Sequence, residues 1–275
     1  MRNCLAGVLL FCLLMTASAC TSRGVEEFQL YSTAFDLQNE TAQRVLDKVA
    51  SAERGSWSRL YDKNKRNPRF NPDSSAYYVN VGDPPFTGSM RQSMAALKQY
   101  NDALVGLANG ETADALVAKV TSVVTNLTGA ITGFESNSVK SDAQLLAIAS
   151  PVAGYLTTAK SILGVALKGA ARQSFRDNLI KAYPYMQRML LEFRKGSQHL
   201  YFVVISQPGV TPEQKLKDRE LFASWVLLID STLQAMEAAV TAAMLRGPAT
   251  DLDALAEYSI ELRVLAEKIR AERNR

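Results

Sequence analysis

Between residues 28 and 52, side chains suited to a protein core recur at alternating spacings of three and four residues. This spacing places the whole series on one side of an α-helix, whereas a β-strand would scatter it over both faces. The members are Phe28, Tyr31, Phe35, Gln38, Ala42, Val45, Val49 and Ala52, with Gln38 as the polar exception. A seam of this kind packs against facing helices, so the chain is predicted to form a helical bundle.

Helix boundaries further along the chain are marked by capping residues. Three pairs fit the capping box: Ser89 with Gln92, Ser141 with Gln144, and Thr211 with Gln214. Asn109-Gly110 and Arg246-Gly247-Pro248 are typical of helix ends. We expect helices over residues 26–60, 89–109, 112–134, 142–182, 184–206, 212–246 and 251–272. Pro184 is expected to kink or break the chain between two of them, and Pro151 to kink the fourth.

The last two predicted helices have different apolar faces. The wide face consists of Leu221, Phe222, Trp225, Leu228, Ile229, Leu233, Met236 and Val240. The narrow seam consists of Leu255, Tyr258, Leu262, Leu265 and Ile269. A wide face suits a bundle core and a narrow seam suits a bundle edge. Together these patterns predict an all-α, multi-helix antiparallel bundle, with residues 20–275 forming one domain.

A long proline-containing loop is expected at residues 62–88, because four prolines forbid a continuous helix there. They are Pro68, Pro72, Pro84 and Pro85. Tyr77, Tyr78, Val79 and Val81 could form a short extended stretch within this loop. A connection of this length in a compact domain is usually functional or disordered. Residues 62–88 are therefore a candidate interaction site.

The first residues read as an export signal. Arg2 precedes an apolar run from Cys4 to Met15, which is too short for the roughly 20 apolar residues of a membrane span. The small residues Ala17-Ser18-Ala19 then lead to Cys20. This segment resembles the lipobox of bacterial lipoproteins, although Ala17 stands where Leu is usual. The resemblance implies a signal peptide over residues 1–19 and a lipid attached to Cys20. The alternative is an ordinary signal peptide cut after Ala19, which leaves Cys20 as a thiol.

Cysteine usage favours lipidation. The cysteines are Cys4, Cys12 and Cys20, and the first two lie in the leader. A single thiol in an exported protein invites intermolecular pairing, which acylation prevents. By resemblance, Cys20 carries a diacylglyceryl group and an N-acyl chain, such as palmitate, and several chains hold a protein firmly to a membrane. Thr21 replaces the Asp that often retains lipoproteins at the inner membrane, so the resemblance implies the outer membrane, facing the periplasm.

Residues 120–159 form a predicted hairpin whose two arms, 120–134 and 143–159, lack charged side chains. One interpretation is a hairpin that inserts into lipid, as in pore-forming or membrane-remodelling proteins. The other is a pair of helices buried within the bundle. Thr and Ser residues along the first arm favour burial, because polar groups are costly in hydrocarbon. A second cluster, with the basic residues Arg172, Arg176, Lys181, Arg188, Arg194 and Lys195, could contact anionic lipid or simply face solvent.

Enzymatic chemistry is weakly supported. His199 is the only histidine, so histidine-dependent nucleophilic devices and most zinc sites lack their usual residues. Glu135-Ser136 weakly resembles the catalytic pair of lytic transglycosylases, but this match of two residues is easily due to chance. A net charge of +4 does not suggest a nucleic-acid partner. No catalytic residue, cofactor or metal ligand is therefore predicted.

These observations favour a membrane-anchored, non-enzymatic interaction or scaffold protein that binds membrane lipid through Cys20 and an envelope protein through helix faces or residues 62–88. A membrane-active protein using residues 120–159 is the alternative, and a carboxylate-based cell-wall hydrolase is a more distant one.

Overall fold

The computed structural model describes residues 25–62, 70, 72–109 and 172–244, together with isolated positions between 118 and 129 and residue 264. Four long helices dominate this part of the chain: α2 (Val25–Asp62), α4 (Pro85–Asn109), α7 (Arg172–Ile205) and α8 (Pro212–Met244). Between α2 and α4 lie a 3-10 turn, η1 (Pro72–Ser74), and a short helix, α3 (Ser75–Tyr78). The predicted all-α fold class is confirmed for the described residues.

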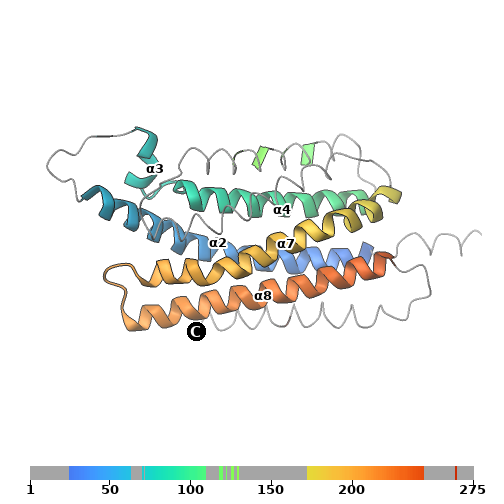
Figure 1. The fold of residues 1–275 in the computed structure, drawn as a ribbon. Helices are drawn as coiled ribbons and strands as arrows, with labels where there is room; N and C mark the ends of the chain where they lie inside the picture. The colour runs from blue at the N-terminus through green and yellow to red at the C-terminus, as the bar shows by residue number, and fades with distance from the viewer. Residues whose placement is uncertain are drawn as a thin grey trace, which may run out of the picture.

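The four long helices form a bundle in which each helix runs opposite to the one before it (Figure 1). Helix α2 contacts α4, α7 and α8. Four ion pairs connect neighbouring helices among the described residues: Lys98–Asp36 at 3.0 Å, Lys48–Asp218 at 3.1 Å, Arg91–Asp47 at 2.9 Å and Arg194–Asp230 at 2.6 Å. The arrangement confirms the predicted antiparallel bundle. The end of α2 at Asp62, the α3 region, the start of α4 and the α7–α8 turn lie together at one end, which we call the distal end.

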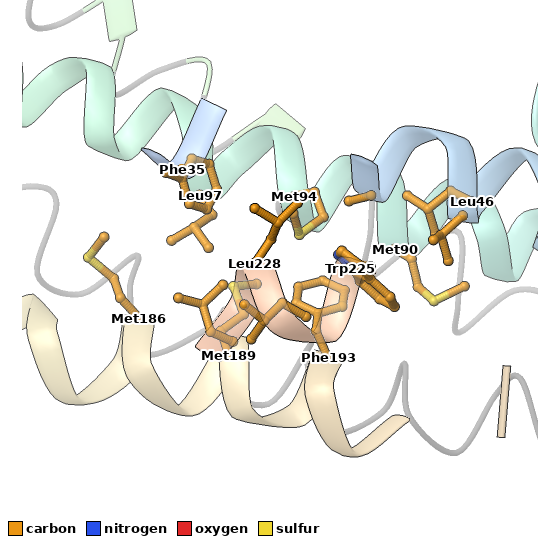
Figure 2. Packing of buried hydrophobic residues seen from close by; sticks show 14 of the residues in the cluster. Phe35, Leu46, Met90, Met94, Leu97, Met186, Met189, Phe193, Trp225 and Leu228 are labelled. Carbon is orange, nitrogen blue, oxygen red and sulfur yellow. The ribbon is translucent and has the colours of Figure 1, made fainter. Parts of the chain in front are cut away.

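The core follows the predicted apolar patterns. From Tyr31 to Ala52, every described member of the first seam is buried, including Gln38. On α8 the predicted wide face is also confirmed, with Leu221 and Leu233 packed at its margin. Trp225 packs edge-on to Phe193 and Phe222, with ring centroids 6.2 Å and 6.3 Å away. Methionines from α4 and α7 fill the space around these rings (Figure 2).

Two predicted helix boundaries are wrong. Helix α4 begins at Pro85 rather than Ser89, because proline is well tolerated at the first helical position. Ser89 is therefore inside the helix, where its hydroxyl donates to the carbonyl of Pro85 at 2.9 Å. Helix α7 runs through Pro184 instead of ending there. Buried apolar residues on both sides of this exposed proline, such as Ala182 and Met186, hold the helix against the core and offset the lost hydrogen bond.

The predicted start of α8 is confirmed at Pro212. The hydroxyl of Thr211 accepts from the Gln214 amide at 3.1 Å, as the capping box requires. The Gln214 side chain donates to Asp218 instead of reaching back, so half of the predicted box forms. The signal peptide, Cys20, the 120–159 hairpin as a unit, the Ser141 cap, Pro151, Glu135 and the 251–272 seam lie outside the described residues.

Candidate interaction site at the distal end

Where the structure describes the predicted 62–88 loop, part of the segment is helical, and α4 already begins at Pro85. Tyr77 and Tyr78 belong to α3, so the predicted extended stretch is wrong for them. Val79 is extended, with φ −127° and ψ 152°. Gly82 adopts φ +80°, a left-handed conformation that glycine accommodates without strain. The residues from Phe70 to Pro84 form a connection across the distal end, and three side chains of α2 hold it in place.

Glu53 is the first of these side chains. Its buried carboxylate accepts hydrogen bonds from the Phe86 amide at 3.1 Å and the Thr87 amide at 2.9 Å. It also accepts from the Thr87 hydroxyl at 2.8 Å and the Tyr77 hydroxyl at 3.2 Å. The amides at the start of a helix have no partner within the helix, and an anion there is stabilised by the helix dipole. Glu53 therefore caps α4 from a different helix and joins α2, α3 and α4.

The environment of Glu53 shifts its protonation. Burial raises the pKa of this carboxyl from 4.5 to about 6, although the four hydrogen bonds from Thr87, Phe86 and Tyr77 oppose the rise. Burial and the neighbouring Glu53 carboxylate also raise the pKa of Tyr77, which keeps its hydroxyl a donor. The carboxylate is thus bound on all sides by protein donors. This arrangement fits a positioning role for Glu53 within the fold.

Arg54 and Trp57 hold the outer part of the connection. The Arg54 guanidinium donates to the carbonyl of Ala76 at 3.2 Å and to the carbonyl of Gly82. The Trp57 ring stacks on Tyr77, with centroids 4.9 Å apart and planes 7° apart. Trp57 also meets Tyr78 edge-on at 5.1 Å. These contacts fix α3 and the residues after it against the end of α2.

Arg91 of α4 closes the connection from the other side. Its guanidinium donates to Asp83 at 2.6 Å and to Asp47 of α2 at 2.9 Å, and it also donates to Gln43. A guanidinium that bridges two carboxylates forms charge-assisted hydrogen bonds, which are stronger than neutral ones. Asp83, the last residue but one before α4, is therefore held against both α2 and α4.

The α7–α8 turn packs against the same end of α2. The Gln207 side chain accepts from Arg59 at 2.8 Å and donates to Ser56 at 3.3 Å. A side chain at Gly55 would collide with it, since a Cβ there would lie 2.5 Å from the Gln207 side-chain oxygen. A side chain at position 55 would therefore force the Gln207 side chain to shift. The contacts of Gln207 connect the α7–α8 turn to the end of α2.

The braced connection leaves large apolar side chains in solvent. Val81 is 82% exposed, Phe70 72% and Val79 50%, and Tyr78 stands at the margin with 36%. We call these four residues the distal surface. Phe70 packs on Tyr78 with ring centroids 5.6 Å apart, so part of the surface is a joined aromatic patch. Apolar side chains that gather in this way often mark an interaction site. Their chemistry supports binding by contact and offers no acid, base or nucleophile.

Of the basic cluster expected from the sequence, Lys181, Arg188 and Lys195 lie along one helix, α7, whereas the side chains of Arg172 and Arg176 lie outside the described residues. His199 lies exposed on α7. Lys181, Arg188, Arg194 and Lys195 are also exposed on α7. Among the described residues, no group of three or more His, Cys, Asp or Glu is placed to hold a metal ion. In the same part of the chain, no helix has both the length and the hydropathy needed to cross a bilayer.

The sequence analysis missed Glu53, Arg54 and Trp57. A signal existed in the Pro84-Pro85-Phe86-Thr87 segment. Pro84, which directly precedes α4, has no side-chain acceptor for the first amides, and Asp83 before it is bound by Arg91, so these amides need a distant acceptor. Comparisons of the chain with family models, with curated proteins and with solved structures found no match.

Proposed function

We propose that the protein is a lipoprotein anchored to a bacterial membrane through acylated Cys20, and that it acts as a non-enzymatic interaction module. Its binding site for another envelope protein is the distal surface. The observation that carries this proposal is the contrast at this site between rigid support and exposure. Glu53, Arg54 and Trp57 fix the backbone, while Val79 and Val81 remain in solvent.

Rigid support matters because ordering a loop on binding costs conformational free energy. A connection already held by hydrogen bonds and ring stacking avoids much of this cost. Exposed valine, phenylalanine and tyrosine side chains then contribute binding free energy when a partner covers them, at roughly 25 cal/mol per Å² of apolar area. Isolated exposed apolar residues are ordinary on protein surfaces, but several on one braced connection are not.

The outer membrane, facing the periplasm, is the proposed location, by resemblance to lipoproteins that lack Asp after the cysteine. The residues on which a membrane-active protein or a cell-wall hydrolase would depend, 120–159 as a unit and Glu135, lie outside the described residues.

Site-specific photo-crosslinking in cells tests the binding site. A photoreactive amino acid replaces Val81 on the distal surface or, as a matched control, Leu227, which is 52% exposed on α8. We expect a discrete crosslinked product from position 81 that is absent from position 227. Val79→Asp in the same chain should abolish this product while circular dichroism stays unchanged, because a carboxylate cannot be buried against an apolar partner without a large cost.

Three outcomes would count against the site: no product from position 81, the same product from both positions, or a product that survives Val79→Asp.

A further inference from the structure

The outward face of α7 combines basic and apolar side chains. Lys181, Arg188 and Lys195 are all exposed and recur every seven residues. Leu191 and Phe202 continue the same stripe and are 46% and 58% exposed. Residues at these spacings share one side of a helix. We call these five residues the α7 basic face.

The charges of this face are not neutralised within the described part of the chain. Lys181, Arg188 and Lys195 form no ion pair there. By contrast, Arg194, at the border facing α8, pairs with Asp230 at 2.6 Å. The acid nearest in sequence, Glu192, is half-buried at the opposite border. From Lys181 to Phe202 the stripe itself contains no acidic residue.

A helix face with this composition matches an anionic bilayer surface. Lysine and arginine near such a surface each contribute about 1 kcal/mol of attraction. Leucine and phenylalanine between them can enter the boundary between headgroups and acyl chains. A face that only contacts water gains nothing from an exposed phenylalanine. We propose that the α7 basic face binds the anionic headgroups of the membrane that carries the protein, so that the bundle lies along the bilayer.

This inference rests on the proposed lipid anchor. The short distance along the chain from Cys20 to α2 is compatible with an anchor at Cys20 and with contact between α7 and the membrane. The five residues from Cys20 to Val25 span at most about 17 Å. Helix α2, which begins at Val25, contacts α7. This short tether keeps the start of α2 close to the membrane, whichever side of the bundle rests on it.

The orientation also places the distal surface. Helix α2 has 38 residues, which corresponds to a length of about 57 Å at 1.5 Å per residue. With the bundle parallel to the membrane, the distal surface lies beside the bilayer, about one helix length from the anchored end. A partner held at the same membrane could reach it there.

Vesicle sedimentation tests the inference with a protein that lacks the acyl chains on residue 20. The probe is the chain from residue 20 onward carrying Cys20→Ser, which contains every described helix and cannot be acylated. We expect binding to vesicles of phosphatidylglycerol and phosphatidylcholine in equal parts, and none to phosphatidylcholine alone. The triple variant Lys181→Gln, Arg188→Gln, Lys195→Gln should bind roughly 100-fold more weakly, as expected from three lost headgroup contacts.

A matched control separates this face from net charge. Lys215→Gln, Lys217→Gln, Arg219→Gln removes the same charge from exposed positions at the start of α8 and should bind as the parent does. The inference is overturned if the parent does not bind anionic vesicles, which is the result expected if the ligand of this face is a protein. It is also overturned if the two triple variants lose equal affinity for the vesicles. Because the probe lacks acyl chains, its failure is distinct from a failure of the lipid anchor.

Discussion

Glu53 illustrates how one buried residue organises the distal end. Its carboxylate receives four hydrogen bonds from α3 and α4. Placing a carboxylate in the interior is costly unless donors surround it. Here the donors are a tyrosine hydroxyl, a threonine hydroxyl and two helix-terminal amides. The residue is therefore tolerated because it caps a helix that supplies no cap of its own.

The raised pKa of Glu53 makes stability depend on pH. A carboxyl with a pKa of 4.5 when unfolded and about 6 when folded binds more protons in the folded state between these values. Its contribution is present below pH 4.5 and is lost as the pH rises through about 6, by about 2 kcal/mol in total. We expect the stability of wild type relative to Glu53→Gln to fall by that amount between pH 4 and 7.5 in urea titrations. Parallel pH profiles for the two proteins would contradict the shift.

Gln38 shows the opposite case of a buried polar residue. Its side chain is fully buried, and neither its amide nitrogen nor its oxygen has a hydrogen-bond partner among the described residues. A buried amide without partners costs about 1–3 kcal/mol. Gln38→Met, which has similar volume, should therefore raise the free energy of unfolding by about that amount. Leu46→Met in the same helix is a control for the change in packing. If Gln38→Met instead lowers the free energy of unfolding, the Gln38 amide has hydrogen-bond partners in the folded protein.

At the scale of elements, the connection from Phe70 to Pro84 depends on α2. Arg54 supplies two of its hydrogen bonds to backbone carbonyls. Loss of both should reduce local stability by about 1.4 kcal/mol and speed amide exchange in residues 76–82 roughly tenfold in Arg54→Ala. Arg219→Ala, an exposed arginine on α8, should leave this exchange unchanged. Equal exchange in both variants would mean that the connection is held by other contacts.

Pro184 gives a second test at this scale. It lies exposed within α7 and lacks the amide that an interior helical residue donates. Pro184→Ala should restore that hydrogen bond and stabilise the protein by about 1–3 kcal/mol, measured as an increase in thermal midpoint. Pro212→Ala at the first position of α8 should give no such increase. Destabilisation by Pro184→Ala would show that the packing of α7 requires the local geometry imposed by proline.

These elements also show what the sequence can predict. The described seams of α2 and α8 were predictable because the buried residues of each helix recur at helical spacing within one continuous segment. The start of α4 was not, because its cap comes from Glu53, far away in the chain. The continuity of α7 through Pro184 depends on packing against other helices, which no local signal reports. Exposure of Val79 and Val81 likewise depends on the fold, although the unusual composition of residues 62–88 indicated the region.

At the scale of the whole molecule, the described bundle has two ends, and a basic face lies along α7. The N-terminal end of α2 is joined by a few residues to Cys20, and the distal surface lies at the opposite end (Figure 1). The α7 basic face runs along the side between them. Under the proposed function, the lipid on Cys20 attaches the N-terminal end to the membrane, the α7 basic face sets the orientation of the bundle, and the distal surface binds a partner. Each of these roles uses different residues, so variants can separate them.

Mass spectrometry of the mature protein purified from cell envelopes tests the proposed attachment most directly. We expect an N-terminal peptide that begins at Cys20 and carries a diacylglyceryl group with an N-linked acyl chain. A peptide that begins at Cys20 with a free thiol, or a chain that retains residues 1–19, would contradict a lipid-held interaction module.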